Sequence, residues 1–356
     1  MTRYIIIRTI WIFIIISIIL TLNFTLLKLA PEYPPTEKND RNMYYARQVY
    51  DGYMTERVEA NPLVMDAMQK QGLVVPRNAW FKNEDDQYRV YEPVPVANQY
   101  FSWVGNVVTE WNWGTSTRLY PGQEVFAVLT SRMGVTLKLN LISLFFYIPI
   151  GFGLGILAAL KKNSVTDNVI SLGVMIFISI PSFVMMTLLL MLFGYTLEWL
   201  PTQYPSGDLT GSIQFTGLIL PVLGLSFGSI AGLTRLTRAE LTEVLTSEFL
   251  LLARTKGLTR TQSVIRHAMR NSMVPLVPSV IGSFVGLLSG SVIIEQIYGI
   301  AGTGRIYIRA MTKNNYDYNI ILGSTAFYTI IGLFAVLLVD LSYGLVDPRI
   351  RMGARK

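Results

Sequence analysis

The stretch EFLLLARTKGLTRTQSVIRHAMRNSMVP, Glu248 to Pro275, is a polar segment that lies between two long apolar runs. It holds the only histidine of the chain, His267. Its basic residues are Arg254, Lys256, Arg260, Arg266 and Arg270. If the flanking runs cross a membrane, this segment is a loop on one side of it. The fold class therefore depends on whether the two flanking runs are membrane-spanning helices.

The spacing of the residues predicts that this loop is a hairpin. Apolar residues recur at helical spacing in and before its first half: Leu241, Leu245, Phe249, Leu252 and Ala253. They predict a helix over about residues 239–256, and Gly257 is a natural left-handed stop. Thr259, with Gln262 three residues later, predicts a capping box that opens a second, amphipathic helix to about Asn271. Such a hairpin suits a protein partner or an anionic lipid surface, and composition alone leaves both open.

The flanking sequence is typical of a polytopic membrane protein. Of the 356 residues, 51% are hydrophobic and 15% are charged, whereas a soluble domain has about 25% charged residues. The uncharged runs are Thr9–Leu27, Leu139–Leu160, Asn168–Leu197, Leu209–Thr234, Asn271–Ile294 and Tyr318–Val339. Because about 20 apolar residues span a bilayer as a helix, these runs predict an all-α fold with six transmembrane helices and both termini on one side.

The first run could instead be a cleaved signal peptide, because it follows Arg3 and Arg8. Its apolar part is longer than the usual stretch of about 7–15 residues, and it lacks a clear cleavage site. We therefore interpret it as a retained anchor.

The basic residues predict the orientation. One side would carry Arg3, Arg8, Lys161, Lys162, the hairpin, Arg349, Arg351, Arg355 and Lys356. The short loops of the other side carry only Arg305, Arg309 and Lys313. Because basic loops stay cytoplasmic, both termini and the hairpin are expected in the cytoplasm. The net charge of +7 is then mainly a topology signal, and the scattered basic residues disfavour nucleic acid as a partner.

These runs predict the organisation of the chain. It consists of a first helix at 1–28, an extracytoplasmic insert at 29–124, a transmembrane domain at 125–345 and a cytoplasmic tail at 346–356. The helices of the domain are expected at about 139–160, 168–194, 217–236, 276–297 and 320–343, with the hairpin at 239–275. The aromatic-rich insert favours a partly ordered cap over a floppy loop.

Glycines recur at helix-packing spacing in two of the spans. Gly151 and Gly155 share one face of the second span, and Gly282, Gly286 and Gly290 share one face of the fifth. Close helix packing explains most of them. The alternative for the fifth span is that part of this face lines a pore.

Several kinds of function are disfavoured by what the sequence lacks. Glu295 and Asp340 lie at span ends, and no ionisable residue lies in mid-span, which argues against an ion-coupled transporter. Metalloprotease, serine-hydrolase and Walker A motifs are missing, and a single histidine cannot build a metal cluster. The chain has no cysteine and therefore no thiol chemistry. Catalytic, cofactor and metal residues are accordingly expected to be none.

Several motifs resemble one family of membrane proteins. LLARTKGL…VIRHAMRNSMVP resembles the EAA-type coupling loop of ABC importer permeases, most closely the B-type permease subunit of bacterial dipeptide and oligopeptide importers. Other stretches agree in order: YFSWVGNVV, GTSTR, TLKLNLISL, ISIPSFV, RLTRAEL, GSVIIEQIYGIAGTGR and LVDLSYGLVDPRIR. The resemblance covers nearly the whole chain except much of Leu29–Gln99. It implies the type I ABC importer permease fold in a bacterial cytoplasmic membrane.

The chain departs from the family pattern in places that leave the cargo open. After the first span it reads LAPEYPP where the family often has P-G-D-P. After the fifth span it has Ala301-Gly302-Thr303-Gly304 where P-G-x-G is common, and Thr255 replaces a common alanine. The insert is also longer than in plain dipeptide members.

The resemblance implies a pore-forming subunit without enzymatic activity. Its expected partners are a C-type permease, two cytoplasmic ATPases that use ATP and Mg, an extracellular peptide-binding protein, the peptide cargo and the lipid bilayer. The implied ATPase-docking residues are Ala253, Arg254, Thr255, Lys256, Gly257, Leu258, Arg266, His267, Arg270, Asn271 and Pro275. Candidate residues of the translocation path or gate are Pro181, Ser182, Gly282, Gly286, Gly290, Glu295, Gly302 and Gly304.

Two alternatives remain. The same architecture could import a nickel chelate, glutathione or a sugar, or the chain could be a membrane receptor that does not transport. The coupling hairpin favours a transporter, because a receptor has no need of an ATPase-docking loop.

Overall fold

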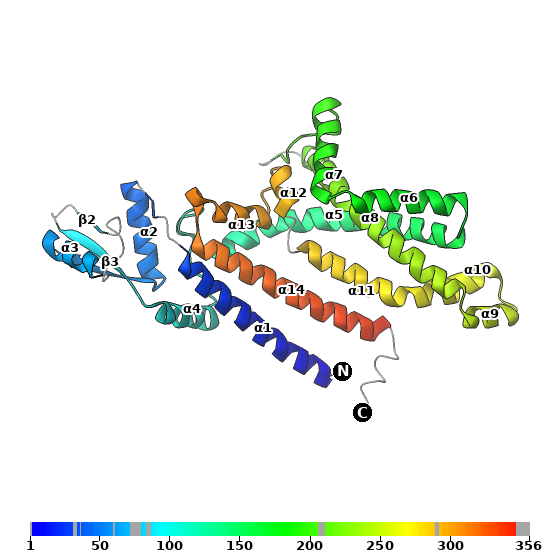
Figure 1. The fold of residues 1–356 in the computed structure, drawn as a ribbon, viewed down its shortest axis with the longest axis horizontal. Coiled ribbons are helices and arrows are strands. Elements are labelled where there is room, and N and C mark those ends of the chain that lie inside the picture. Colours follow the sequence, from blue (N-terminus) through cyan, green and yellow to red (C-terminus); the bar gives the residue numbers. More distant parts are fainter. Residues whose placement is uncertain are drawn as a thin grey trace. The chain divides into compact units, whose positions relative to one another are not determined.

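The computed structural model describes residues 2–30, 34–35, 37–59, 61–71, 80–82, 87–205, 211–288 and 292–346. The chain divides into two compact units. Unit 1 comprises Met1–Thr9, Met133–Arg305 and Ile330–Lys356, and unit 2 comprises Ile10–Arg132 and Ile306–Thr329. The long helices α1 (Thr2–Leu29), α5 (Val125–Leu160) and α14 (Tyr318–Val346) contribute to both units (Figure 1).

Unit 1 is helical, as the predicted membrane domain requires. Its other elements are α6 (Val165–Ser179), α7 (Ser182–Leu189), a π-helical turn (Leu190–Thr196), α8 (Gly211–Leu245), α9 (Glu248–Thr255), α10 (Arg260–Ser263), a second π-helical turn (Val264–Ala268), α11 (Met269–Leu288) and α12 (Val292–Ile297). The helix α13 (Thr303–Met311) and a short 3-10 turn (Lys313–Asn315) then lead into α14.

The described ranges contain four helices that are long and apolar enough to cross a membrane: Ile6–Leu29, Val125–Leu160, Ser212–Leu245 and Tyr318–Tyr343. The pair of α6 and α7 is a further candidate, bent by 98°. The expected continuous helix over 168–194 was therefore wrong. Pro181 explains the bend, because proline disfavours helical geometry in the residue before it, and Ile180 is extended (φ −85°, ψ 121°).

The helix expected over 276–297 falls on two described elements. These are α11, described to Leu288, and α12, described from Val292. The residues between them lie outside the described ranges. The count of six spanning helices and the domain bounds derived from it therefore stay predictions.

Glycines bring α5 and α8 close together. A Cβ on Gly151 would lie 3.0 Å from the Leu233 side chain, and one on Gly155 would lie 2.9 Å from the Thr234 carbonyl oxygen. The Thr234 hydroxyl donates a hydrogen bond to the Gly151 carbonyl at 3.2 Å. The packing interpretation of these two glycines is confirmed.

The described residues of the insert, in unit 2, form strands as well as helices. Its elements are α2 (Lys38–Tyr50), β1 (Met54–Glu59), α3 (Pro62–Lys70), β2 (Trp80–Lys82), β3 (Tyr88–Pro93) and α4 (Val96–Glu110). The strands form an antiparallel sheet in the order β1-β3-β2, which the sequence analysis did not predict. Tyr45 stacks on Tyr91 with ring centroids 4.6 Å apart, beside the buried Tyr44 and Met54. Tyrosines thus build the small core of the insert.

Asp317 holds the GTSTR motif within unit 2. Its Oδ2 accepts hydrogen bonds from the Ser116 hydroxyl at 2.6 Å and from the backbone N–H groups of Thr117, Arg118 and Leu119 at 3.1, 2.9 and 3.1 Å. Burial raises the pKa of Asp317 despite these donors. The motif therefore has a structural role in this chain, as the cradle of a buried carboxylate.

A second buried carboxylate, Asp51, follows α2. Asn319 donates through Nδ2 to Asp51 Oδ2 at 2.6 Å and to the Thr115 carbonyl at 2.8 Å. The Tyr53 hydroxyl donates to Asn319 Oδ1 at 3.2 Å. Burial raises the pKa of Asp51 to about 6, and the hydrogen bond from Asn319 opposes this shift. Asn319 therefore ties the start of α14 to the insert.

Candidate functional site

The polar stretch at 248–275 forms the predicted hairpin. α9 ends at Thr255, Gly257 has a φ of +95°, and α10 begins at Arg260. The Thr259 hydroxyl accepts a hydrogen bond from Gln262 N at 3.3 Å, and Gln262 Oε1 accepts one from Thr259 N at 3.1 Å. The glycine turn and the capping box are confirmed.

Both limbs of the hairpin differ from the predicted lengths. The helix expected over 239–256 is divided between the end of α8 and α9, because the chain is extended at Ser247 (φ −74°, ψ 147°). The helix expected to end at Asn271 continues, and helical elements follow one another from Arg260 to Leu288. The second limb is therefore the end of the helix that forms α11.

The hairpin packs on the ends of two long helices. Leu250 of α9 and Ala268 of the second limb are buried in one cluster with Ala159 of α5 and Leu241 of α8. Close-packed interiors transmit displacement with little compression. A movement of the hairpin therefore displaces the ends of α5 and α8.

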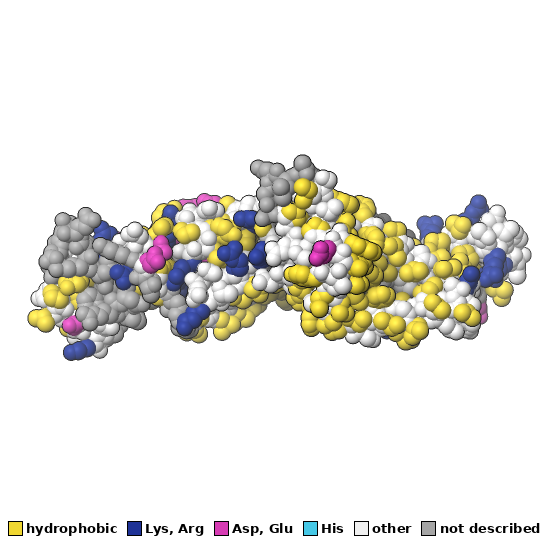
Figure 2. All heavy atoms as spheres, turned by 90° about the horizontal axis from the view of Figure 1, so that it is seen from above, with side chains coloured by type: hydrophobic (Ala, Val, Ile, Leu, Met, Phe, Trp, Pro, Cys, Tyr) yellow, Lys and Arg dark blue, Asp and Glu magenta, His cyan; other side chains and the backbone are white. Residues whose placement is uncertain are grey.

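The outer face of the hairpin is apolar and basic. Its exposed large apolar residues are Phe249, Leu251, Leu252 and Ile265. Its exposed polar residues include Arg254, Thr255, Lys256, Arg260, Arg266, His267, Arg270 and Asn271, and the one exposed acidic residue of the stretch is Glu248. Figure 2 shows Lys and Arg side chains on the part of unit 1 that carries α9 and α10. An apolar patch with a charged rim is typical of a protein contact.

The remaining hairpin residues from the sequence prediction have internal positions. Ala253 is buried, and Leu258 and Pro275 are half-buried. The Thr255 hydroxyl donates to the Leu252 carbonyl at 2.8 Å, within α9. Thr255 therefore satisfies its hydroxyl locally, so its replacement of alanine is compatible with the helix.

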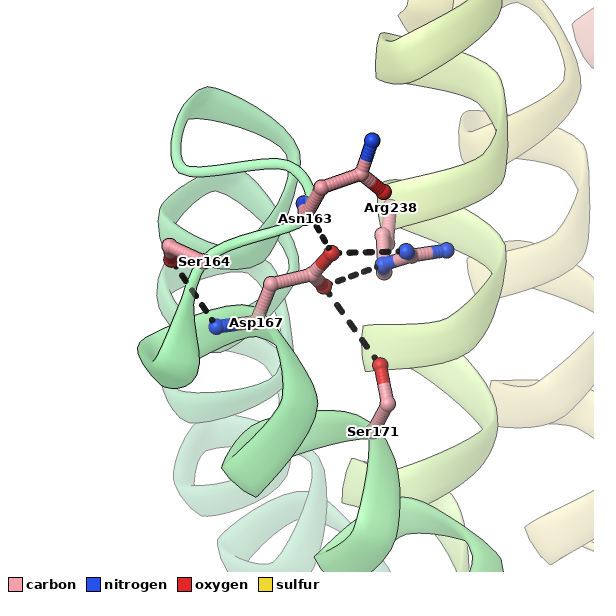
Figure 3. Close-up of polar contacts among 5 residues, drawn as sticks. All are labelled: Asn163, Ser164, Asp167, Ser171 and Arg238. Carbon is pink, nitrogen blue, oxygen red and sulfur yellow. Dashed lines mark hydrogen bonds and ion pairs between the residues drawn. The ribbon is translucent and has the colours of Figure 1, made fainter.

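An ion pair that the sequence analysis missed joins α6 to α8 (Figure 3). Arg238 donates from Nε to Asp167 Oδ1 at 2.6 Å and from Nη2 to Asp167 Oδ2 at 2.8 Å. The Asn163 N–H donates to Oδ2 at 2.9 Å and the Ser171 hydroxyl to Oδ1 at 3.4 Å. The Ser164 hydroxyl caps α6 by accepting from Asp167 N at 3.3 Å. This pair therefore fixes α6 to the helix that leads into the hairpin.

Three of the candidate residues of the translocation path or gate, Glu295, Gly302 and Gly304, lie together. The Thr136 hydroxyl donates to Glu295 Oε1 at 2.9 Å, and the Arg305 N–H donates to Oε2 at 2.8 Å. A Cβ on Gly302 would collide with this carboxylate, and one on Gly304 would lie 3.1 Å from its Oε2. Glu295 is fully buried, so the cluster fixes the loop after α12.

The other candidate path residues are dispersed. Pro181 and Ser182 are exposed at the bend between α6 and α7. A Cβ on Gly282 would make an ordinary contact of 3.6 Å with a side chain of α14. Gly286 lies in α11, and Gly290 lies outside the described residues.

A hydroxyl-lined cavity lies between α5, α8 and α11. Its volume is about 260 Å³. Its hydroxyl groups come from Tyr147 of α5, Ser229 of α8, and Ser279 and Ser283 of α11. Gly232, Leu233, Leu236 and Val280 complete the lining. Ser279 and Ser283 are one helical turn apart and both exposed. The sequence carries a signal for this polar face, because serines at this spacing share one face of an apolar helix. The prediction for this helix rested on its glycines and did not include the serines.

Comparisons with known proteins agree on a transport family. The family model described as "Binding-protein-dependent transport system inner membrane component" matches residues 151–352. The dipeptide transport system permease protein DppB of Bacillus subtilis (strain 168) is 30% identical over 353 residues, which cover 99% of this chain and 99% of that protein.

Two further relatives match a shorter part of the chain. DppB of Lactococcus lactis subsp. cremoris (strain MG1363) is 34% identical over 258 residues, 72% of this chain and 82% of the relative. The oligopeptide transport system permease protein OppB of Escherichia coli (strain K12) is 34% identical over 257 residues, 72% of this chain and 81% of the relative.

A solved structure supports the fold. An inward-facing structure of the MetNI methionine ABC transporter matches with a TM-score of 0.50 and 17% sequence identity. The match covers 62% of this chain and 97% of that chain. At this identity the likeness concerns the fold alone.

Proposed function

The chain belongs to the family of binding-protein-dependent transport system inner membrane components, and we propose that it is a pore-forming subunit of an ATP-driven importer of dipeptides or oligopeptides. The names of the relatives and the coupling hairpin support this proposal together. The observation that carries it is the capped hairpin at 248–275, with an exposed apolar and basic face and a buried root on α5 and α8.

In this proposal the exposed face of the hairpin docks on a cytoplasmic ATPase. The apolar residues, Leu251, Leu252 and Ile265, fill a groove of the partner, and the basic residues around them meet its acidic rim. ATP binding and hydrolysis then move the hairpin as a rigid body. The buried cluster at its root passes this movement to α5 and α8, so the pore switches between two states.

The cargo surface in this proposal is the hydroxyl-lined cavity. Serine and tyrosine hydroxyls both donate and accept hydrogen bonds, and so match the N–H and C=O groups that every peptide carries. Ser279 and Ser283 supply such groups without a charge. A cavity of this kind recognises the peptide backbone and tolerates varied side chains.

The assembly is proposed on the same basis. A C-type permease completes the pore, two ATPases bind ATP and Mg, and an extracellular binding protein delivers the peptide, while this chain binds no cofactor. The ion pair between Arg8 Nε and Asp340 Oδ2, at 2.7 Å, joins the first turns of α1 to the last turns of α14. It supports both termini lying on the same side of the membrane, which the basic loops assign to the cytoplasm.

The test is uptake by the reconstituted complex. Proteoliposomes that contain this chain, its partner permease, both ATPases and the binding protein should accumulate a labelled dipeptide or oligopeptide only when ATP is present. Nickel chelate, glutathione and sugar serve as competing cargoes. ATP-dependent uptake of one of these without peptide uptake would replace the cargo assignment. Stable folding with ligand binding but no uptake of any cargo would favour a receptor.

A further inference from the structure

A second cavity lies on the other side of α8 from the hydroxyl-lined one, between α6 and α8. Its volume is about 490 Å³, within the usual range of a binding site, about 300–1,000 Å³. Val174, Met175 and Ile178 of α6 form its apolar wall. Thr234, Arg235, Arg238 and Ala239 line it from α8, and Arg238 is the arginine already paired with Asp167. A cation thus lies in a largely apolar groove.

Arg235 has no carboxylate to pair with. Across the described part of the chain it makes no hydrogen bond or ion pair, and it is exposed. The nearby carboxylate of Asp167 already accepts from Arg238 twice, from the Asn163 N–H and from the Ser171 hydroxyl. A carboxylate has about four acceptor positions, so Asp167 is saturated. Among the described residues, Asp167 is therefore not available as an anion for Arg235, which leaves this arginine open to an anion from outside them.

The surroundings of the groove indicate the kind of anion. The outer side of α6 exposes Val169, Leu172 and Ile176, which suits contact with acyl chains. Lys161 and Lys162 are exposed on the turn that leads to Asn163, beside Asp167. A phosphate at this end of the groove would therefore meet a basic rim, while the rest of the ligand meets apolar side chains.

We propose that the groove between α6 and α8 binds an anionic phospholipid of the cytoplasmic leaflet. Its phosphate lies on Arg235, and one acyl chain follows Val174, Met175 and Ile178. Basic residues near a spanning helix attract the anionic lipids of this leaflet. The assignment to the leaflet rests on the proposed orientation of the chain. The assignment of the ligand does not depend on the peptide cargo.

Native mass spectrometry of the detergent-purified complex tests this site. Dioleoyl phosphatidylglycerol and dioleoyl phosphatidylcholine, which share their acyl chains, are titrated separately. The wild-type complex should bind phosphatidylglycerol more tightly. Arg235→Gln should lower that affinity about fivefold, the effect of one basic residue at an anionic surface, and Arg235→Lys should retain most of it. Arg309→Gln is the matched control, because this exposed arginine lies on α13, outside both the groove and the hairpin.

Two further measurements distinguish the occupants. Val174→Phe fills the groove and should lower the binding of both lipids. This variant tests whether lipid occupies the groove even if Arg235→Gln does not fold. Glycerol 1-phosphate should not displace the lipid, because it lacks acyl chains. Unchanged affinity in both variants, or displacement by glycerol 1-phosphate, would overturn the proposal. Cross-linking of Met175→Cys to the partner permease would also overturn it, because the partner would then occupy the groove in place of lipid. The introduced cysteine is the only thiol of this chain, which has none of its own.

Discussion

Gly302 lies against the carboxylate of Glu295 so closely that the space for a side chain on Gly302 is already filled by that carboxylate. The carboxylate cannot move aside freely, because Thr136 and the Arg305 N–H hold one oxygen each. The glycine and the glutamate are therefore a matched pair, and the AGTG loop closes over the buried side chain of Glu295.

Gly302→Ala should lower the stability of the complex by about 1–3 kcal/mol, the usual cost of overpacking a filled interior. The change forces Glu295 away from at least one of its two donors. Gly282→Ala is the control, because its Cβ would make only an ordinary contact. Melting of the purified complex, followed by tryptophan fluorescence, measures both. Equal melting temperatures for the two variants would contradict this account of the AGTG loop.

Gly257→Val should lower ATP-dependent uptake strongly while leaving the protein in the membrane. A φ of +95° strains any residue with a Cβ, by roughly 1–2 kcal/mol, and more when the residue is β-branched. A Cβ at this position would meet no other atom within 4 Å. A loss of uptake would therefore come from backbone strain, which changes the direction of the second limb.

The control for that prediction is Gly257→Asn, because asparagine tolerates left-handed geometry better than valine. It should keep most of the uptake. Uptake and ATPase stimulation by the loaded binding protein are measured side by side. Normal values of both in Gly257→Val would mean that the hairpin does not couple the ATPase to the pore.

Asp167→Asn should destabilise the attachment of α6 to α8 by about 2 kcal/mol. The substitution leaves Arg238, which is one-third exposed, without its anion, and this partial exposure reduces the cost below that of a fully buried pair. Ser171→Ala removes only a long hydrogen bond and should cost less. A double-mutant cycle with Arg238→Gln, read by thermal melting, should give a coupling of about 1 kcal/mol or more. Additive effects would show that the pair contributes no joint stability.

The stability of the insert should fall as the pH rises from about 4 to 6. Burial raises the pKa of Asp51 from 3.8 to about 6, so the folded state holds a proton that the unfolded state has lost. This stabilisation is complete below about pH 4 and lost above about pH 6. The shift corresponds to about 3 kcal/mol. The raised pKa of Asp317 acts in the same direction.

Asp51→Asn should flatten this dependence, whereas Asp66→Asn, at an exposed position of α3, should not. Hydrogen exchange of the backbone amides of β1 and β3, corrected for intrinsic rates, reports the stability at each pH. An insert that becomes more stable between pH 4 and 6 would reverse the sign of the prediction.

The parts that the sequence predicted are those with local signals. The glycine turn at Gly257 and the cap at Thr259 depend on residues within one or two turns of helix, and both are present. The bend at Pro181 also has a local cause, but the apolar run around it was read as a single helix. The exposed basic residues of the hairpin were found because charge inside an apolar chain is conspicuous.

The parts that were missed depend on residues far apart in the chain. Asp167 and Arg238 are separated by 71 positions, and neither position by itself indicates a partner. The sheet of the insert pairs β1 with β3 across a helix and an intervening strand. Its pairing is set by tertiary packing rather than by a strand pattern, since strand propensity depends on the neighbours of each strand.

The second limb continues into α11, so a displacement of the limb is passed along a nearly continuous helix. In the proposed assembly the second limb faces the ATPase at Arg260, and helical elements follow one another from there to Leu288. The bending stiffness of this helix is not uniform. Pro275 and Pro278 lack the N–H groups that would bind the carbonyls of the preceding turn. The helix is therefore most easily bent about two to three turns beyond Ala268, the last buried residue of the root. In the proposed mechanism, the displacement that reaches the pore depends on how far the helix bends at these two prolines.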